Sequence, residues 1–289
     1  MSIEAEEKIN FIKDGQLSEN KKIKMSASQA SLFNECGLLW SFKYLTKIKP
    51  DKLVTYDATI YGSALHSTLE EVLLLEASTE EKIEVASSIF LREFKKHFNK
   101  SKEDGFHVII AGGDLKKAIQ NHIYSAKLGV QKILNSDLIK GYDKLICEGE
   151  FNYSSEHFEI VAKIDLVGMY ADETYDVVDF KTGKHFHFKG IKDELQALFY
   201  IMVCYDRFKI LPNTFKFLKY DKANFSLKEI EIEEEITLDT IDYFKNATKK
   251  LDAEITTSIE NKHFRKHDPT QKAQYCQWCA YKTACSKVK

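Results

Sequence analysis

The stretch VVDFKTG, residues 177–183, places two charged side chains in a run that otherwise predicts a buried strand. Asp179 and Lys181 are two residues apart, so in a strand they point to the same face. A charged pair on a buried strand is costly unless the charges are paired or used. Asp165 repeats the pattern in AKIDLVG, one predicted strand earlier. Two carboxylates on neighbouring strands can hold one divalent cation, and oxygen ligands suit Mg²⁺ or Mn²⁺.

Two interpretations of this charged pair stay open at this point. As a site, Lys181 would stabilise charge on a phosphate or orient an attacking water beside the cation. As structure, Asp179 and Lys181 would form an ordinary salt bridge, and their spacing favours neither interpretation. The neighbouring KTGK does not predict a phosphate-binding P-loop, because the upstream glycines of that motif are missing.

Two weaker patterns lie on predicted helices. In YGSALHSTLEEV, Gly62 would let the backbone approach a ligand closely, and His66 follows four residues later. In LQALFY, Gln196 and Tyr200 are four residues apart and therefore share one helix face. A helical histidine is more often a satisfied structural residue than a ligand, so neither pattern identifies a site by itself.

Three closely spaced cysteines near the C-terminus give a stronger pattern. Cys276, Cys279 and Cys285, in QYCQWCAYKTAC, could place three thiolates around one metal. Structural Zn²⁺ and a 4Fe–4S cluster each take four ligands, so a fourth is needed. Cys36 is the natural candidate, since the other two cysteines fall in a predicted strand and a predicted buried helix, where free cysteine behaves as a small hydrophobe. Thiolate spacing separates iron–sulfur from zinc poorly.

Length and composition limit the class of protein. The 289 residues carry a formal net charge of -2, and 44% are hydrophobic and 30% charged, as in an ordinary globular protein. No apolar run approaches the roughly 20 residues of a membrane span, and the acidic N-terminus does not resemble a signal peptide. We therefore expect a cytoplasmic protein without membrane contact. Its six cysteines should be reduced or bound to metal rather than paired as disulfides.

Hydrophobic periodicity predicts the elements that position these residues. We expect helices within 26–45 and 61–139, an antiparallel meander of three strands from Lys144, a buried helix at 193–208, two strands within 214–232, and a helix from Leu238 to about Lys262. The chain has no repeats and no linker rich in glycine, serine or proline. This order predicts an α/β or α+β domain with a helical segment before the meander.

Taken in order, these motifs resemble the PD-(D/E)XK nuclease superfamily, and more narrowly its RecB-like branch with an iron–sulfur cluster. That branch includes the CRISPR-associated RecB-family exonucleases and the nuclease domains of bacterial helicase–nucleases. Its pattern is one cysteine, G-x-x-x-H, an aspartate at a strand end, (D/E)-x-K, Q-x-x-x-Y and C-x2-C-x5-C. This chain supplies Cys36, Gly62–His66, Asp165, Asp179–Lys181, Gln196–Tyr200 and Cys276–Cys279–Cys285.

The resemblance implies an α/β fold with a restriction-endonuclease-like core, in which helices flank a central mixed sheet. A flexible segment at 1–25 would precede one nuclease domain at 26–289, with a helical insertion at 67–143. A 4Fe–4S cluster bound by the four cysteines would join the N-terminal segment to a cysteine-rich tail at 274–289.

The resemblance also implies a metal-dependent DNA exonuclease that acts on single-stranded DNA or duplex ends. The metal ligands would be the side chains of His66, Asp165 and Asp179 and the carbonyl of Phe180, holding Mn²⁺ or Mg²⁺. Lys181 would position the attacking water or stabilise the developing charge. Gln196 and Tyr200 would support the active site or contact DNA.

The resemblance leaves the pathway and two rival functions open. Protein partners in repair, recombination or CRISPR adaptation would fit the family. One rival is a catalytically silent DNA-binding or scaffold subunit of a repair or integration complex, against which the intact Asp165, Asp179 and Lys181 argue. The other is a nuclease that cuts RNA instead of DNA.

Overall fold

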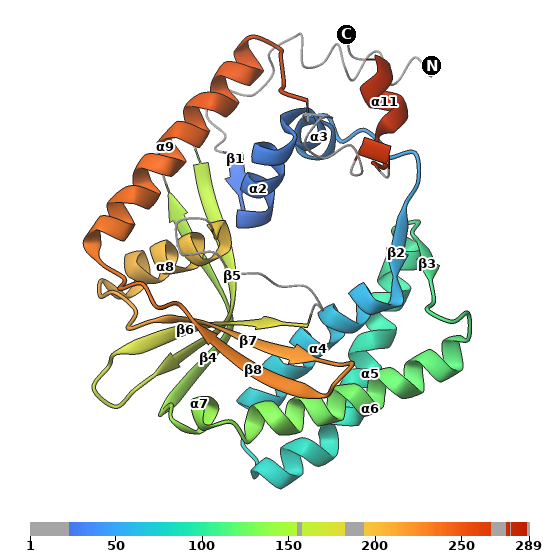
Figure 1. Ribbon diagram of the computed structural model, residues 1–289, viewed down its shortest axis with the longest axis vertical. Helices are drawn as coiled ribbons and strands as arrows, with labels where there is room; N and C mark the ends of the chain where they lie inside the picture. The colour runs from blue at the N-terminus through green and yellow to red at the C-terminus, as the bar shows by residue number, and fades with distance from the viewer. Residues whose placement is uncertain (1–22, 155–157, 183–193, 267–275, 278, 288–289) are drawn as a thin grey trace. The chain divides into compact units, whose positions relative to one another are not determined.

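The computed structural model describes residues 23–154, 158–182, 194–266, 276–277 and 279–287 (Figure 1). Of the segment expected to be flexible, residues 1–22 lie outside this description, and Ile23–Met25 form strand β1. Parts of the cysteine-rich tail, among them residues 274, 275 and 278, also lie outside it. Among the described residues, no helix combines the length and the apolar character needed to cross a membrane.

The fold contains one mixed sheet of six strands in the order β1-β5-β6-β7-β8, with β4 paired to β5. The remaining bounds are Lys144–Ser154 for β4, Phe158–Met169 for β5, Tyr175–Lys181 for β6, Phe215–Asp221 for β7 and Ser226–Glu231 for β8. The pairs β5–β6 and β7–β8 are antiparallel, whereas β1–β5 and β6–β7 are parallel. The connection from β6 to β7 includes helix α8 (Leu195–Phe208), because parallel strands need a long crossover.

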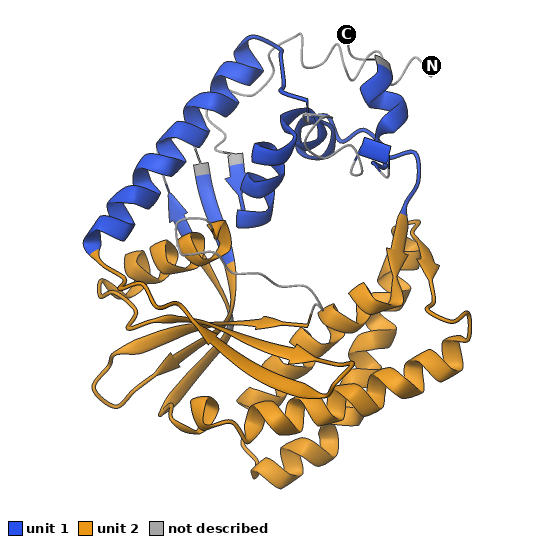
Figure 2. Ribbon diagram, in the orientation of Figure 1, with its two compact units in different colours: residues 1–53, 152–162, 238–289 blue, residues 54–151, 163–237 orange. Residues whose placement is uncertain are grey.

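The chain divides into two compact units, which have different colours in Figure 2. The larger unit comprises residues 54–151 and 163–237, and the smaller unit comprises residues 1–53, 152–162 and 238–289. All residues expected at the divalent-metal site belong to the larger unit, and all four cysteines expected to bind a cluster belong to the smaller one. The single domain at 26–289 and its insertion at 67–143 stay predictions.

Helices cover both faces of the strands in the larger unit, as the expected α/β fold requires. They are α4 (Asp57–Leu74), α5 (Thr79–Glu103), α6 (Leu115–Leu134), α7 (Asp137–Lys140) and α8. Val178, Phe180 and Leu218 belong to a buried cluster with side chains of α4, α5 and α6. On the opposite face, Tyr200 of α8 packs against Phe215, with 6.1 Å between the ring centroids. Successive strand residues therefore alternate between a helical layer and α8.

Local hydrogen bonds define helix starts in this unit. Ser78 and Glu81 form a reciprocal capping box at the start of α5, and Asp114 caps α6. Between these helices, β3 (His107–Ile109) pairs in parallel with β2 (Val54–Tyr56). The periodicity of this region does not predict the pair, because strands of three residues are too short to set an alternating pattern.

The smaller unit packs aromatic side chains around the buried Trp40. The Trp40 ring lies 5.4 Å from that of Phe33 and 6.5 Å from that of Phe264. Helices of the unit that the structure describes in full include α2 (Ala27–Glu35), α3 (Gly37–Trp40), a π-helical turn at Ser41–Leu45, α9 (Leu238–Glu260) and α11 (Lys282–Lys287). The helical stretch expected within 26–45 is thus broken at Cys36, whose extended backbone (φ -155°, ψ 95°) separates α2 from α3.

Candidate active site

Asp179 and Lys181 lie on β6 and contact each other directly. Lys181 Nζ is 2.7 Å from Asp179 Oδ2. The Asp179 side chain is only 2% exposed, whereas that of Lys181 is 24% exposed. A carboxylate this deeply buried needs several partners to offset its desolvation. The residues around the pair therefore decide between a structural salt bridge and a site.

A second carboxylate, that of Asp165, lies beside this pair on β5. The antiparallel register joins Leu166 to Val178. One position further along the two strands, Asp165 and Asp179 are opposite each other. Asp165 Oδ2 accepts a hydrogen bond of 2.8 Å from the backbone N–H of Phe180. The structure thus brings together the two carboxylates that the sequence suggests as ligands of one cation.

Helix α8 adds a hydrogen-bonded amide and a hydroxyl to the group. Gln196 Nε2 donates to Asp179 Oδ1 over 2.8 Å, and Gln196 Oε1 accepts from Lys181 Nζ over 2.6 Å. Gln196 Nε2 also donates to Tyr200 Oη, 2.9 Å away and one helical turn further on. One amide therefore holds both charged residues of β6 in fixed positions.

His66 approaches the carboxylates from α4. Its Nδ1 is 3.2 Å from Asp165 Oδ1, and its ring meets that of Phe180 edge-on. Burial by itself would lower the pKa of His66, but the hydrogen bond with Asp165 and the charge of that carboxylate outweigh it and raise the pKa. Gly62 lies one turn earlier, where a Cβ would be only 3.0 Å from Thr182 Oγ1. The missing side chain lets α4 pack closely against the end of β6.

Burial and charge repulsion perturb the ionisation of this group. Burial, followed by the charge of Asp165, raises the pKa of Asp179 to about 7, although Lys181 and His66 oppose the shift. Burial, together with the same carboxylates, also raises the pKa of Tyr200. Two carboxylates side by side, of which that of Asp179 is buried, repel each other, so either a proton or a cation stabilises them.

The donor set suits a divalent cation held mainly by the two carboxylates. Asp179 Oδ2 is buried, and no donor within the described segments meets it in hydrogen-bond geometry, although the Lys181 ammonium is close. No three histidine, cysteine, aspartate or glutamate side chains in the described part of the chain are close enough together to hold a metal ion. His66 contacts Asp165 instead. Two carboxylates, the Phe180 carbonyl and water would supply the oxygen ligands that Mg²⁺ accepts.

The four cysteines of the smaller unit influence one another. Burial raises the pKa of the Cys279 thiol, and the thiols of Cys36 and Cys276 raise it further. The pKa of Cys285 is raised by burial and then by the other three thiols, against the effect of Lys266. The described residues nevertheless bring no three of these thiols into a metal-binding arrangement.

Backbone and aromatic contacts join the tail to the N-terminal segment within the smaller unit. The Asp51 N–H donates to the Ala280 carbonyl over 2.5 Å, and the Thr283 N–H donates to Asp51 Oδ2 over 2.9 Å. The rings of Phe42 and Tyr281 stack with 6.1 Å between their centroids. The segments that the cysteines were expected to join are thus in contact through other residues.

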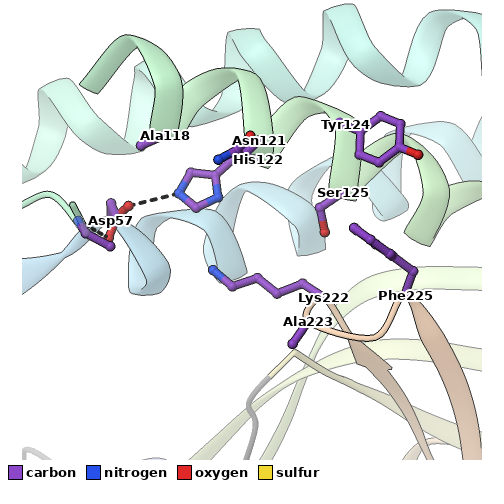
Figure 3. Close-up of a pocket in the computed structure, with 10 residues that line it drawn as sticks. Asp57, Ala118, Asn121, His122, Tyr124, Ser125, Lys222, Ala223 and Phe225 are labelled. Atoms are coloured by element: carbon purple, nitrogen blue, oxygen red, sulfur yellow. Dashed lines mark hydrogen bonds and ion pairs between the residues drawn. The ribbon is translucent and has the colours of Figure 1, made fainter. Parts of the chain in front are cut away.

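A buried polar pair was not predicted from the sequence. Asp57 is the first residue of α4, and its Oδ2 lies 3.1 Å from His122 Nε2. Its Oδ1 accepts a hydrogen bond of 3.3 Å from the Ala111 N–H. Together with Lys222, the pair lines a cavity of about 370 Å³ (Figure 3). Asp57 and His122 are 65 residues apart, so no spacing rule connects them, and Asp57 alone resembles an ordinary acidic residue of a first helical turn.

Comparisons with known proteins agree with this fold. The family model of the PD-(D/E)XK nuclease superfamily matches residues 24–286. No curated protein sequence matches the chain. The crystal structure of a candidate exonuclease from Eubacterium rectale aligns with a TM-score of 0.54 and 13% identity over 89% of each chain, a likeness of fold alone. That of SSO0001 aligns over 99% of this chain and 96% of the other, with 11% identity and a TM-score of 0.38, too low to support an argument.

Proposed function

Because the chain belongs to the PD-(D/E)XK nuclease superfamily, we propose that it is a metal-dependent nuclease that hydrolyses phosphodiester bonds in DNA. Its substrates would be single-stranded DNA or duplex ends, cut as by an exonuclease. The observation that carries the proposal is the convergence of Asp165, Asp179 and Lys181 on adjacent strands. Carboxylates beside an ammonium group are the parts that phosphodiester hydrolysis with a cation requires.

The divalent cation, Mn²⁺ or Mg²⁺, would be held by Asp165, Asp179 and the Phe180 carbonyl. When bound, it would activate a water molecule and offset charge on the phosphate. The raised pKa of Asp179 supports this assignment, because a cation would relieve the repulsion between the two carboxylates. As a further ligand, His66 would have to exchange its contact with Asp165 for one with the cation.

Lys181 is the residue that we propose acts on the reacting phosphate. Its partly exposed side chain can reach a bound strand while its ammonium stays next to the buried Asp179. Gln196 restrains that ammonium through the 2.6 Å hydrogen bond, and such restraint favours the reactive geometry. Burial raises the pKa of Tyr200 further above neutral pH, so its hydroxyl keeps its proton and remains a hydrogen-bond donor even in alkaline solution.

The four cysteines of the smaller unit would bind a 4Fe–4S cluster, with Zn²⁺ as the alternative. Four thiolates satisfy either group, and the effect of the neighbouring thiols on the pKa of Cys279 and of Cys285 supports a common site. The contacts of Asp51 with the tail would align the two segments before metal binds. A cluster here would have a structural role, and it would place the chain in the RecB-like branch that serves repair, recombination or CRISPR adaptation.

The proposal is tested with protein purified without oxygen and mixed with end-labelled single-stranded DNA. We expect cleavage with Mn²⁺ or Mg²⁺ and none in EDTA, with a product ladder that shortens from one end. Protein that has an intact fold and cuts DNA with neither metal would refute the nuclease and favour a silent DNA-binding subunit. Faster cleavage of an RNA strand of the same sequence would refute DNA as the substrate.

A further inference from the structure

The cavity beside Asp57 lies outside the residues of the proposed nuclease site. Its walls come from the start of α4, from one face of α6 and from the turn between β7 and β8 (Figure 3). Its volume of about 370 Å³ falls within the roughly 300–1,000 Å³ of small-molecule pockets. The cavity is therefore large enough to receive part of a ligand.

Asp57 and Lys222 make one wall of the cavity charged, and the Asp57 carboxylate already has partners within the protein. The Asp57 carboxylate contacts His122 and the Ala111 backbone. Lys222 points into the cavity in Figure 3, and its Nζ lies 4.8 Å from the centre of the Tyr61 ring. Burial lowers the pKa of Lys222, and the charge of Asp57 only partly compensates for it. An anion bound in the cavity would stabilise this half-buried ammonium.

Two exposed aromatic rings lie at the other side of the cavity. Tyr124 of α6 is 61% exposed and Phe225 of the turn is 37% exposed, and their rings meet edge to face at 5.6 Å. Figure 3 shows Lys222 between these rings and Asp57. Exposed aromatic faces of this kind are surfaces on which nucleic-acid bases stack.

The backbone of Phe225 adds an independent observation. Its φ angle is 50°, in the left-handed region that side chains with a Cβ adopt at a cost. Glycine or asparagine usually occupies such a turn position, and a bulky residue there is an outlier. Outliers of this kind gather at functional sites, which makes the turn that carries Phe225 a candidate for contact with a ligand.

We propose that this cavity binds one nucleotide of the DNA strand, with the phosphate on Lys222 and the base stacked on Phe225. The inference rests on the proposed nuclease function, which supplies the strand. A nucleotide combines an anion with a flat, largely apolar base, and the cavity offers an ammonium and an exposed ring three residues apart on one turn. Asn121 also lines the cavity and could hydrogen-bond the edge of the base.

The distance to the proposed nuclease site sets the length of strand required. Helix α4 carries both Asp57, at the cavity, and His66, at the carboxylates. Nine residues of α-helix rise by about 14 Å at 1.5 Å per residue. At about 3.4 Å per stacked nucleotide, this corresponds to roughly four nucleotides. The cavity would therefore hold the strand about four nucleotides from the bond that is cut.

The test measures binding of a fluorescent twelve-nucleotide thymidine strand in EDTA, where it is not cut. Phe225→Ala should raise Kd about tenfold, the factor that corresponds to loss of ~1.4 kcal/mol of stacking. Lys222→Gln should raise Kd and reduce the slope of log Kd against log salt by roughly 0.7, as for one lost phosphate contact. Control variants are Tyr243→Ala and Lys132→Gln, which remove an exposed ring and an exposed charge elsewhere.

Strand length provides a second comparison. A two-nucleotide strand cannot span both places, so the wild-type protein should bind it much more weakly than the twelve-nucleotide strand. Wild-type protein that neither binds nor cuts DNA would overturn the nuclease proposal itself. If the wild-type protein binds and cuts DNA but the cavity variants have the same Kd as their control variants for strands of every length, only the cavity proposal is overturned. Variants that lose affinity for free thymidine monophosphate but not for the strand would also overturn it, in favour of a free nucleotide.

Discussion

Replacing Asp179 with asparagine should stabilise the metal-free protein at neutral pH while abolishing DNA cleavage. The Asp179 side chain is buried next to Asp165, and asparagine keeps its shape without its charge. The amide oxygen can still accept the hydrogen bond from Gln196. Lys181 loses its ion-pair partner but is partly exposed, so water can solvate it. Sites of this kind exchange stability for function.

The size of the effect follows from the pKa of Asp179. Its value is about 7 in the folded protein and 3.8 ordinarily. Between these values the folded protein holds a proton that the unfolded chain has lost, so stability falls as pH rises through this window. At about 1.36 kcal/mol per pKa unit, the ionised carboxylate costs about 4 kcal/mol above pH 7. The raised pKa of His66 acts in the same direction, because the stability gained from its protonation is also lost as pH rises.

Thermal unfolding in EDTA, followed by circular dichroism, measures this effect. At about 2 °C per kcal/mol, the Tm of Asp179→Asn should exceed that of the wild type by about 8 °C at pH 8. The difference should fall to less than half at pH 5. Asp143→Asn, which changes an exposed carboxyl group of the same unit, is the control and should leave Tm unchanged. Equal Tm values for Asp179→Asn and wild type at pH 8, or a difference independent of pH, would refute the reasoning.

Gln196→Ala should lower kcat about 10- to 100-fold, because Lys181 loses the oxygen that orients it. Loss of a supporting residue at a metal site has an effect of this size, and an unchanged kcat would contradict this role. Cys279→Ala should reduce both the iron or zinc content of the purified protein and its Tm, and full metal content would show that Cys279 is not a ligand. Gly129→Ala should destabilise the protein by about 1 kcal/mol, since overpacking outweighs the gain in helix propensity. Its Cβ would lie 2.9 Å from the Tyr220 ring, and a urea midpoint at or above that of the wild type would refute this.

In the larger unit, spacing along the chain predicted side-chain contacts best where both residues of a pair lie on the same strand or helix. A separation of two residues on a strand put Asp179 and Lys181 on one face, and they are in contact. A separation of four on a helix did the same for Gln196 and Tyr200. The strands and helices after residue 190 also lie close to their expected bounds, because their periodic patterns are long enough to read.

Contacts between distant parts of the chain could not be predicted in this way. Strand β1 pairs with β5 through Ile23 and Phe158, and nothing in either stretch indicates the other. At the break between α2 and α3, the Leu39 N–H donates a hydrogen bond to the sulfur of Cys36, which caps α3. Such a cap does not change the hydrophobic periodicity of the sequence, so periodicity could not predict the break. The cavity beside Asp57 likewise depends on long-range packing.

The central claim is that Asp165, Asp179 and Lys181 form the catalytic site of a nuclease. Its most direct test is single-turnover cleavage of end-labelled single-stranded DNA with Mn²⁺, comparing wild type, Lys181→Ala and Lys228→Ala, which changes an exposed lysine of the same unit. Circular dichroism would verify that all three are folded. We expect Lys228→Ala to match the wild type and Lys181→Ala to cut about 100- to 1,000-fold more slowly. Cleavage by Lys181→Ala at the wild-type rate would contradict the account.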